Sequence, residues 1–286
     1  MIFETKPLSA GLYFVATPIG AARDITLRAL DILASADVIA AEDTRTARKL
    51  MDIHGVPLGS RRVVAYHDHS TENVRARLMA EIAAGKSVAY VSEAGTPLVA
   101  DPGFALGRAA IAAGFQIIGA PGPSAVLAAL TVSGLPSDRF LFVGFLPTTA
   151  AARRTELAAL ADVSATLVFY ESPKRVGKLL TAMCETLGAE RSGVVCRELT
   201  KKFEEVQRGT LGELALAIGD APLRGEVVVL VDRGDGRETD DDEIEAALRN
   251  AMKTMRVKDA ATAVAGAFGL ARRDVYQAAL KLESDE

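Results

Sequence analysis

The stretch SVAYVSEAGTPLVADPGF, residues 87–104, joins an apolar run to a loop rich in glycine, proline and acidic residues. Its first part, 87–93, is short and rich in Val and Tyr, which is typical of a strand. The loop after it places residues that bend the chain beside residues that carry charge. This arrangement raises the question of whether the loop only turns the chain or also binds a ligand.

Similar strand-like runs alternate with helical patterns over the first 120 residues, at 12–18, 36–43, 61–67, 87–93 and 116–121. This alternation predicts a largely parallel sheet covered by helices. Ligands bind at the carboxyl ends of the strands in open α/β sheets, so three turn-rich loops together form a candidate pocket: 17–20, 93–103 and 121–124. For any one of these loops the alternative is an ordinary turn between strand and helix.

A different order of elements begins near residue 121, with predicted strands at 140–147, 165–172, 193–200, 204–210 and 225–232. The third and fourth of these runs are too close for a crossover helix and predict an antiparallel hairpin. A linker without apolar residues, 233–243, precedes three short helical patterns. We therefore expect an α/β fold of two domains with a helical module, divided as 1–120, 121–234 and 235–286.

Composition limits the classes of partner. The 286 residues carry a net charge of −4, which excludes a uniformly basic nucleic-acid coat but allows a local basic face. No run approaches the ~20 apolar residues that span a bilayer, and the first residues do not form a secretory signal. Cys184 and Cys196 form no CxxC pair. We expect a cytoplasmic protein that has no membrane partner.

The motif AEDTR, 41–45, places Glu42, Asp43 and Arg45 directly after a strand. The carboxylates are suited to orient or deprotonate a hydroxyl. The alternative is that Asp43 or Thr44 caps the next helix while Arg45 is solvated. The pair His67 and His69 has HxH spacing, but the sequence offers no further ligands, so we expect no metal site.

Two further segments carry positive charge. In CRELTKKFEE, 196–205, Lys201 is suited to contact a phosphate or to lower the pKa of a hydroxyl nucleophile; the alternative is a solvated hairpin. The last helices resemble a helix-turn-helix, and between residues 249 and 281 seven basic residues face two acidic ones. This patch predicts RNA contacts, against the alternative of a packing module with ordinary surface charge. The candidates are Arg256, Lys258, Arg272 and Arg273.

The sequence has no GxxxxGK[ST] and no GxGxxG after a strand, which argues against a P-loop or an ordinary NAD site. Taken in order, LYFVATPIG, AEDTR, SEAGTP, APGPSAVLAAL, GLPSDRF, ESPKR and RELTK resemble the tetrapyrrole-methylase superfamily, most closely its ribosomal RNA branch. The resemblance covers about residues 11–232. The loop TPIG lacks the GxGPG pattern of the porphyrin-modifying branch, and Glu93 stands where many relatives have Asp.

The resemblance implies two α/β domains that hold S-adenosyl-L-methionine in the cleft between them, usually in a homodimer. It implies methylation of the ribose 2′-hydroxyl of cytidine 1402 in 16S rRNA of the small ribosomal subunit. The cofactor pocket that it implies consists of Pro18, Glu93, Ala94, Gly95, Thr96, Pro97, Asp101, Pro102, Ser124, Ala125, Tyr170, Glu171, Glu198, Leu199, Gly225, Glu226 and Val227.

For catalysis we expect in-line displacement, with Glu42 or Asp43 as base or hydroxyl orienter. Arg45 and Lys201 then act on phosphate or on developing charge. Two alternatives stay open at this point. One is a small-molecule, tetrapyrrole-like methyltransferase on the same scaffold, which predicts a deep apolar cavity. The other is a non-catalytic RNA-binding assembly factor, against which the intact motifs argue.

Overall fold

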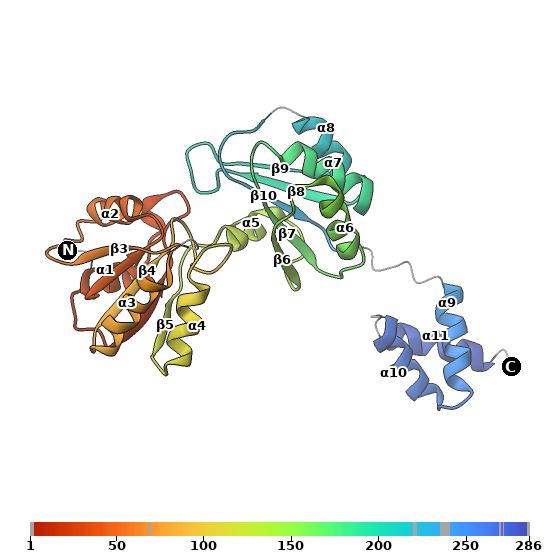
Figure 1. The fold of residues 1–286 in the computed structure, drawn as a ribbon. Helices are drawn as coiled ribbons and strands as arrows, with labels where there is room; N and C mark the ends of the chain where they lie inside the picture. Colours follow the sequence, from red (N-terminus) through yellow and green to blue (C-terminus); the bar gives the residue numbers. More distant parts are fainter. Residues whose placement is uncertain are drawn as a thin grey trace.

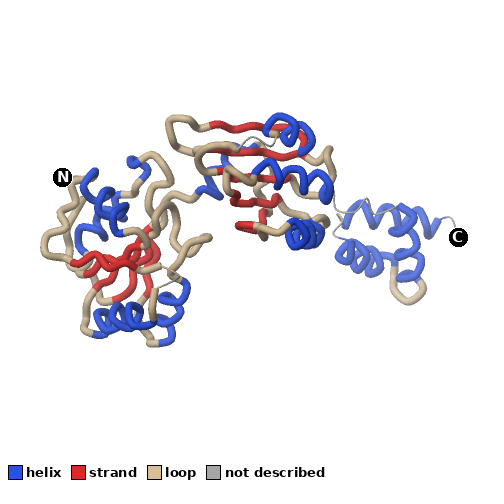
Figure 2. The backbone as a smooth tube through the Cα atoms, turned by 45° about the horizontal axis from the view of Figure 1, so that its top comes forward, coloured by secondary structure: helices blue, strands red, loops and turns tan. Residues whose placement is uncertain are grey.

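The computed structural model describes residues 3–67, 70–219, 222–234, 241–268, 270 and 272–284. Two five-stranded sheets follow one another along the chain, and a group of three helices comes after them (Figure 1). The strands of the two sheets form two separate groups, each flanked by helices (Figure 2). The expected fold class, two α/β units with a small helical module, is confirmed.

The first sheet is parallel throughout, in the strand order β3-β2-β4-β1-β5. Its strands are β1 (Gly11–Val15), β2 (Val38–Ala41), β3 (Arg62–Ala65), β4 (Ser87–Val91) and β5 (Ile117–Ala120). The helices around it are η1 (Ala22–Asp24), α1 (Leu27–Ser35), α2 (Thr44–Ile53), α3 (Glu72–Ala83) and α4 (Phe104–Ala112). All five expected strands are present, and α4 was not predicted.

Because side chains alternate between the two faces of the first sheet, the first domain has two hydrophobic cores. Tyr13 and Val15 of β1 pack with the buried face of α1 and with Met51 of α2. Leu12 lies in the other cluster, with Leu78 of α3 and residues of α4. Since successive side chains of a strand point to opposite faces, α1 and α2 cover one face of the sheet and α3 and α4 the other. Both faces of the strands are therefore covered, which explains their nearly continuous apolar sequences.

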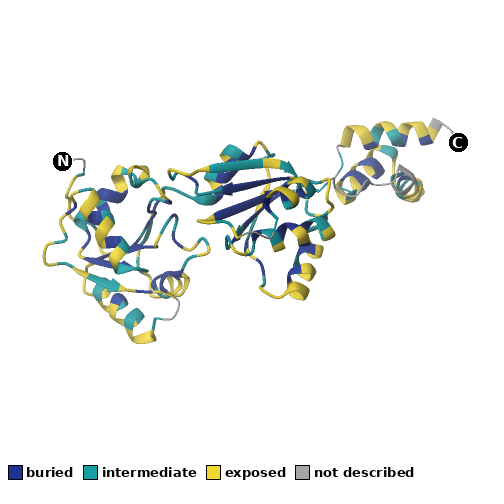
Figure 3. Cartoon of the chain, turned by 90° about the horizontal axis from the view of Figure 1, so that it is seen from above, coloured by how far each residue is buried: buried dark blue, intermediate teal, exposed yellow. Residues whose placement is uncertain are grey.

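The second sheet is mixed, in the order β6-β7-β10-β8-β9. Its strands are β6 (Phe140–Phe145), β7 (Thr166–Glu171), β8 (Ser192–Arg197), β9 (Glu205–Thr210) and β10 (Val227–Val231). Strands β6 and β7 are parallel, and the remaining pairs are antiparallel, including the expected β8–β9 hairpin. The central strands are buried, while the helices around them expose their outer sides (Figure 3).

The second sheet is also covered on both faces. One face packs against α6 (Ala150–Leu160), α7 (Val176–Leu187) and α8 (Leu211–Ile218). The other face packs against α5 (Ala125–Ser133), whose Val126, Ala129 and Leu130 share a cluster with Ile19 of the first domain. Helix α5, which was not predicted, thus lies where the two domains meet. The divisions at 120 and 234 stay a prediction; residue 120 ends β5, and 235–240 of the expected linker lie outside the described residues.

The three expected C-terminal helices are α9 (Asp241–Met252), α10 (Val257–Phe268) and α11 (Arg272–Ser284). They share a small core in which Leu248, Val264, Val275 and Leu282 are buried. Gly269 lies outside the described residues. Among the helices of the described ranges, none has the length and apolar composition that a bilayer crossing requires.

Candidate active site

Three loops lie together at the carboxyl edge of the first sheet. Thr17 and Gly95 exchange backbone hydrogen bonds, with N···O distances of 2.9 and 3.0 Å. The hydroxyl of Thr96 donates to the Pro123 carbonyl at 2.9 Å. The loop that follows β4 is therefore fixed to the loop that follows β1, where Pro18 lies, and to the loop that precedes α5. This brings together the segments 17–20, 93–103 and 121–124.

Two loops hold non-glycine residues in the left-handed backbone region. In the described part of the chain, the non-glycine residues with positive φ are Leu98 (73°), Ala100 (59°), Glu198 (53°) and Thr200 (64°). The left-handed region costs a non-glycine residue free energy and persists only where surrounding contacts enforce it, which happens most often at functional sites. The first two residues lie in the loop after β4, the other two in the loop after β8. Both loops were expected to bind a cofactor.

A compact ion-pair network fixes the second strained loop. Lys201 Nζ donates to Glu198 Oε1 at 2.9 Å and to Glu226 Oε2 at 3.0 Å, and the Glu226 N–H donates to Glu198 Oε1 at 3.0 Å. Burial acts to lower the pKa of Lys201, but the two hydrogen bonds outweigh it and raise that pKa. The hydrogen bond from Lys201 lowers the pKa of Glu198. A Cβ at Gly225 would lie 2.2 Å from Glu198 Oε1, so glycine is needed there.

The loop after β1 packs against the loop after β8, and this contact joins the two domains. The Ala21 N–H donates to Thr200 Oγ1 at 3.0 Å. A Cβ at Gly20 would lie 2.5 Å from Lys201 Cγ and 2.6 Å from Thr200 Oγ1. The absence of a side chain at Gly20 therefore lets the two loops approach each other closely.

A pocket of about 350 Å³ lies at this junction, between α5, the loop after β1 and Thr200. Ser124, an expected cofactor residue, lines it. Ile19, Gly122 and Pro123 also line it, from the loops 17–20 and 121–124 that were expected to form a pocket. The sequence analysis missed its other residues: Asp24, Thr26, Leu127, Ala128, Thr131 and Thr200. The spacing of residues 124, 127, 128 and 131 is that of one helix face, and this periodicity was the available signal.

Tyr170, at the end of β7, packs against the hydrophobic cluster at the domain junction. Burial and the negative charge of Asp101 raise the pKa of its phenol to about 12, against the opposing effect of a hydrogen bond with the backbone of Val126. Its ring packs edge-on against Phe142 at 4.9 Å between centroids. The phenol therefore stays protonated at neutral pH, and Asp101 from the first domain lies close enough to act on it.

Some expected cofactor residues have other partners. The buried Glu171 carboxylate receives two hydrogen bonds from Arg175, both 2.8 Å, and one from the Ser172 N–H. Val227 packs into the core beneath α6 to α8. Leu199 and Ala125 pack together with Ile19 in the cluster at the domain junction. The loop residues Pro97 and Pro102 are buried, Ala94 is half-buried, and Glu93 is exposed.

The AEDTR motif is held by backbone contacts. Asp43 caps α2, accepting from the N–H groups of Arg45 at 2.7 Å and Thr46 at 3.4 Å, and it pairs with the Arg45 guanidinium at 2.8 Å. The hydrogen bonds from Arg45 lower the pKa of Asp43 to about 2, which makes this carboxylate a weak base at neutral pH. Glu42 Oε2 accepts from the Glu93 N–H at 3.0 Å, connecting AEDTR to the loop after β4.

The remaining candidates are the two histidines and the basic residues of the helical module. In the described ranges, no group of three or more His, Cys, Asp or Glu side chains could hold a metal ion. The His67 N–H donates to Ser70 Oγ, and His69 lies outside the described residues. Arg256 and Lys258 line a groove of the helical module, to which Arg272 and Arg273 do not contribute.

Comparison with known proteins identifies both parts of the chain. Residues 11–215 match the model of the Tetrapyrrole (Corrin/Porphyrin) Methylases, and residues 238–283 match the RsmI C-terminal HTH domain. The Ribosomal RNA small subunit methyltransferase I of Mesorhizobium japonicum is 47% identical over 97% of this chain and 94% of its own length. The protein of that name from Mycobacterium tuberculosis is 43% identical over 96% and 95%.

Solved structures agree with this assignment at the level of the fold. The methyltransferase CobJ superposes with a TM-score of 0.60 at 21% identity, over 79% of this chain and 95% of its own. Uroporphyrin-III C-methyl transferase from Thermus thermophilus, complexed with S-adenyl homocysteine, superposes with a TM-score of 0.55 at 20% identity, over 78% and 97%. From the family model and the relatives, the chain belongs to the tetrapyrrole methylase family of methyltransferases.

Proposed function

We propose that this chain transfers a methyl group from S-adenosyl-L-methionine to the ribose 2′-hydroxyl of cytidine 1402 in 16S rRNA of the small ribosomal subunit. The relatives named Ribosomal RNA small subunit methyltransferase I, similar over nearly their whole length, support the substrate. The complex of a fold neighbour with S-adenyl homocysteine supports the cofactor. The observation that carries the proposal is that both strained loops contact the loop after β1: Gly95 exchanges backbone hydrogen bonds with Thr17, and Thr200 accepts from the Ala21 N–H.

The residues at this junction fit such a cofactor. The pocket of about 350 Å³ lies within the usual range of ~300–1,000 Å³ for small-ligand sites. The Ser124 hydroxyl lines this pocket, and the loops 93–97 and 198–199, which contact the pocket residues Ile19 and Thr200, would hold the cofactor with it. Asp101 and Tyr170 would contact it from the two domains. The Glu171 carboxylate is bound to Arg175, so Glu171 would contact the cofactor only with its backbone.

When bound, the cofactor supplies a methyl group already activated on a sulfonium sulfur. The chain must then align the ribose hydroxyl and accept its proton. We assign this to Glu42, since the Glu93 N–H fixes one carboxylate oxygen and the other makes no hydrogen bond to the described residues. Arg45, whose side chain is 88% exposed, would contact a phosphate; Lys201, paired with two glutamates, would hold its loop in place.

Glu42 can be tested by two substitutions. Glu42→Gln keeps an oxygen that accepts from the Glu93 N–H but removes the base, so we expect kcat to fall ~10²–10⁴-fold with cofactor affinity unchanged. Glu42→Ala removes both functions, so cofactor affinity should fall as well. The measurements are steady-state kinetics and calorimetry with S-adenosyl-L-methionine. A Glu42→Gln enzyme with wild-type kcat would show that Glu42 is not the base.

The acceptor can be tested by labelled methyl transfer. We expect small ribosomal subunits that lack the modification to accept label from S-adenosyl-L-methionine, and a uroporphyrin-type macrocycle to accept none. Transfer to the macrocycle alone would support the small-molecule alternative. If the chain binds the cofactor but transfers label to neither substrate, the proposed acceptor is wrong. If it neither binds the cofactor nor transfers label, the alternative of a non-catalytic assembly factor is supported.

The proposal includes a cytoplasmic homodimer and RNA contacts by the helical module. Strand β6 lies at an edge of the second sheet and exposes Phe140, Leu141 and Phe145, which supports association through this apolar patch. Of the basic residues expected to contact RNA, Arg256 and Lys258 are exposed and line the groove of the helical module, and we assign the RNA contact to these two.

A further inference from the structure

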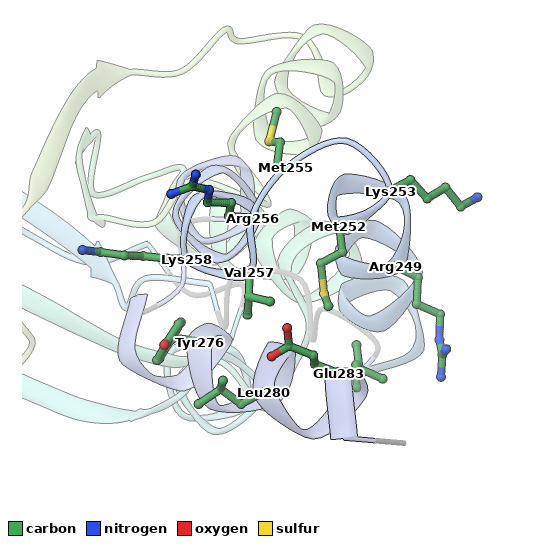
Figure 4. Close-up of a pocket in the computed structure, with 11 residues that line it drawn as sticks. Arg249, Met252, Lys253, Met255, Arg256, Val257, Lys258, Tyr276, Leu280 and Glu283 are labelled. Carbon is green, nitrogen blue, oxygen red and sulfur yellow. The ribbon is translucent and has the colours of Figure 1, made fainter. Parts of the chain in front are cut away.

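A groove of about 750 Å³ lies in the helical module, where the end of α9, the turn to α10 and the outer side of α11 meet (Figure 4). Its apolar lining includes Met252, Val257, Tyr276 and Leu280. Leu280 is 36% exposed and Tyr276 is half-buried, so an aromatic ring and an aliphatic side chain are open to a ligand. The groove is therefore large and apolar enough to take a planar group.

Basic side chains flank this groove on two sides. Arg249 and Lys253 extend on one side and Arg256 and Lys258 on the other, with Met252 and Glu283 between them (Figure 4). Arg249 is paired with Glu245 at 2.7 Å. With the described residues, the other three basic side chains form no ion pair. The groove therefore presents uncompensated positive charge on both sides of an apolar lining.

An aromatic and aliphatic lining between basic side chains is the combination that binds single-stranded nucleic acid. Bases stack on aromatic rings while cations contact the phosphates. We propose that this groove binds an unpaired segment of RNA, with a base over Tyr276 and Leu280 and its flanking phosphates at Arg256, Lys258 and Lys253. The inference rests on the proposed function, since it assigns the groove to the RNA that the enzyme modifies.

Glu283 indicates where the base lies. A carboxylate repels phosphate, but it accepts hydrogen bonds from exocyclic amino groups such as N4 of cytosine. Glu283 lines the groove and makes no hydrogen bond or ion pair with the described residues. If the amino group of a base donates to Glu283 while the flanking phosphates lie at the basic side chains, both the carboxylate and the cations of the groove have partners.

This mode of binding differs from duplex recognition by a helix-turn-helix. There the second helix enters the major groove and its N-terminal residues contact base edges. In this module those residues would be Arg272 and Arg273 of α11, which do not line the groove. The two modes therefore use different basic pairs of the same module, so each pair serves as the control for the other.

The test uses the full chain and a fluorescent 12-nucleotide single-stranded RNA, with binding followed by anisotropy at several salt concentrations. We expect the double substitution Arg256→Gln, Lys258→Gln to weaken binding tenfold or more and to lower the salt slope by about 1.4, at ~0.7 per lost phosphate contact. The matched pair Arg272→Gln, Arg273→Gln should change affinity less than twofold. If the Arg272, Arg273 pair loses more RNA affinity than the Arg256, Lys258 pair, or if a hairpin duplex binds more tightly than the single strand, the proposed role of the groove is wrong.

The base contact is tested separately. Tyr276→Phe should retain the affinity and Tyr276→Leu should lose about fivefold or more, because stacking is worth ~1–3 kcal/mol per base. Glu283→Gln should reduce the preference for oligocytidine over oligouridine. Equal affinity of the Leu and Phe variants would overturn the stacking role, and tight binding of an acidic peptide in place of RNA would overturn the proposal as a whole.

The outcome can be separated from that of the proposed function. If the wild-type chain binds the single strand through this groove but transfers no methyl group, the groove stands and the proposed reaction fails. If methyl transfer occurs and the two basic pairs behave alike in the binding test, the reaction stands and the groove fails.

Discussion

Replacing Glu171 with alanine should lower the free energy of unfolding by about 3–5 kcal/mol. The Glu171 side chain is fully buried and accepts two hydrogen bonds from Arg175, whose side chain is 26% exposed. Removing the carboxylate leaves a largely buried guanidinium that keeps only its hydrogen bond to the Leu146 carbonyl. The measurement is urea denaturation, followed by a probe in the second domain.

Two variants control this prediction. Glu185→Ala breaks an ion pair with Arg154 in the same domain, where both side chains are about half exposed, so it should cost less than ~1 kcal/mol. The double variant Glu171→Leu, Arg175→Met replaces the buried pair by apolar side chains and should recover most of the loss. If Glu171→Ala costs no more than Glu185→Ala, the buried pair does not have the role assigned to it.

Replacing Gly20 with valine should lower kcat/KM for methyl transfer by about 100-fold, the cost expected of displacing a site by about 1 Å. A Cβ at this position would lie 2.5 Å from Lys201 Cγ and 3.0 Å from the Leu199 carbonyl oxygen, so the two loops must separate. Gly20 is exposed, so the loss of stability should be small. Kinetics and thermal unfolding of one preparation measure both effects.

The matched control is Gly119→Val in β5 of the same domain. A Cβ at Gly119 meets nothing within 4 Å, so its rate should stay within twofold of wild type. Equal rates for both variants would show that contact between the loops is not needed for transfer. A large loss of stability in the Gly20 variant would place its effect in folding.

The sequence predicted the strands well because most of them are short apolar runs bounded by turn residues; β9, EVQRGT, is the exception. Helices α4 and α5 were missed for a physical reason. Their sequences, FALGRAAIA and AVLAALTVS, are apolar on nearly all sides, so they lack the polar face that reveals helical periodicity. Since α5 lines the pocket at the domain junction, missing it also hid Leu127, Ala128 and Thr131.

Contacts between segments that are distant in the sequence could not be predicted from sequence patterns. Thr200 binds the backbone of Ala21, 179 positions away, and Glu42 binds that of Glu93, 51 positions away. No local spacing encodes such pairs. The motifs that carry the resemblance include loops that the structure brings together, but the position of Glu171 against Arg175 depends on packing after β7, which a motif does not specify.

The most direct test of the central claim is the identity of the methylated nucleoside. Small subunits that lack the modification are incubated with the enzyme and labelled S-adenosyl-L-methionine, and the 16S rRNA is digested to nucleosides. The account predicts label in 2′-O-methylcytidine from position 1402. Label in a base-methylated nucleoside, or at another ribose, would contradict it.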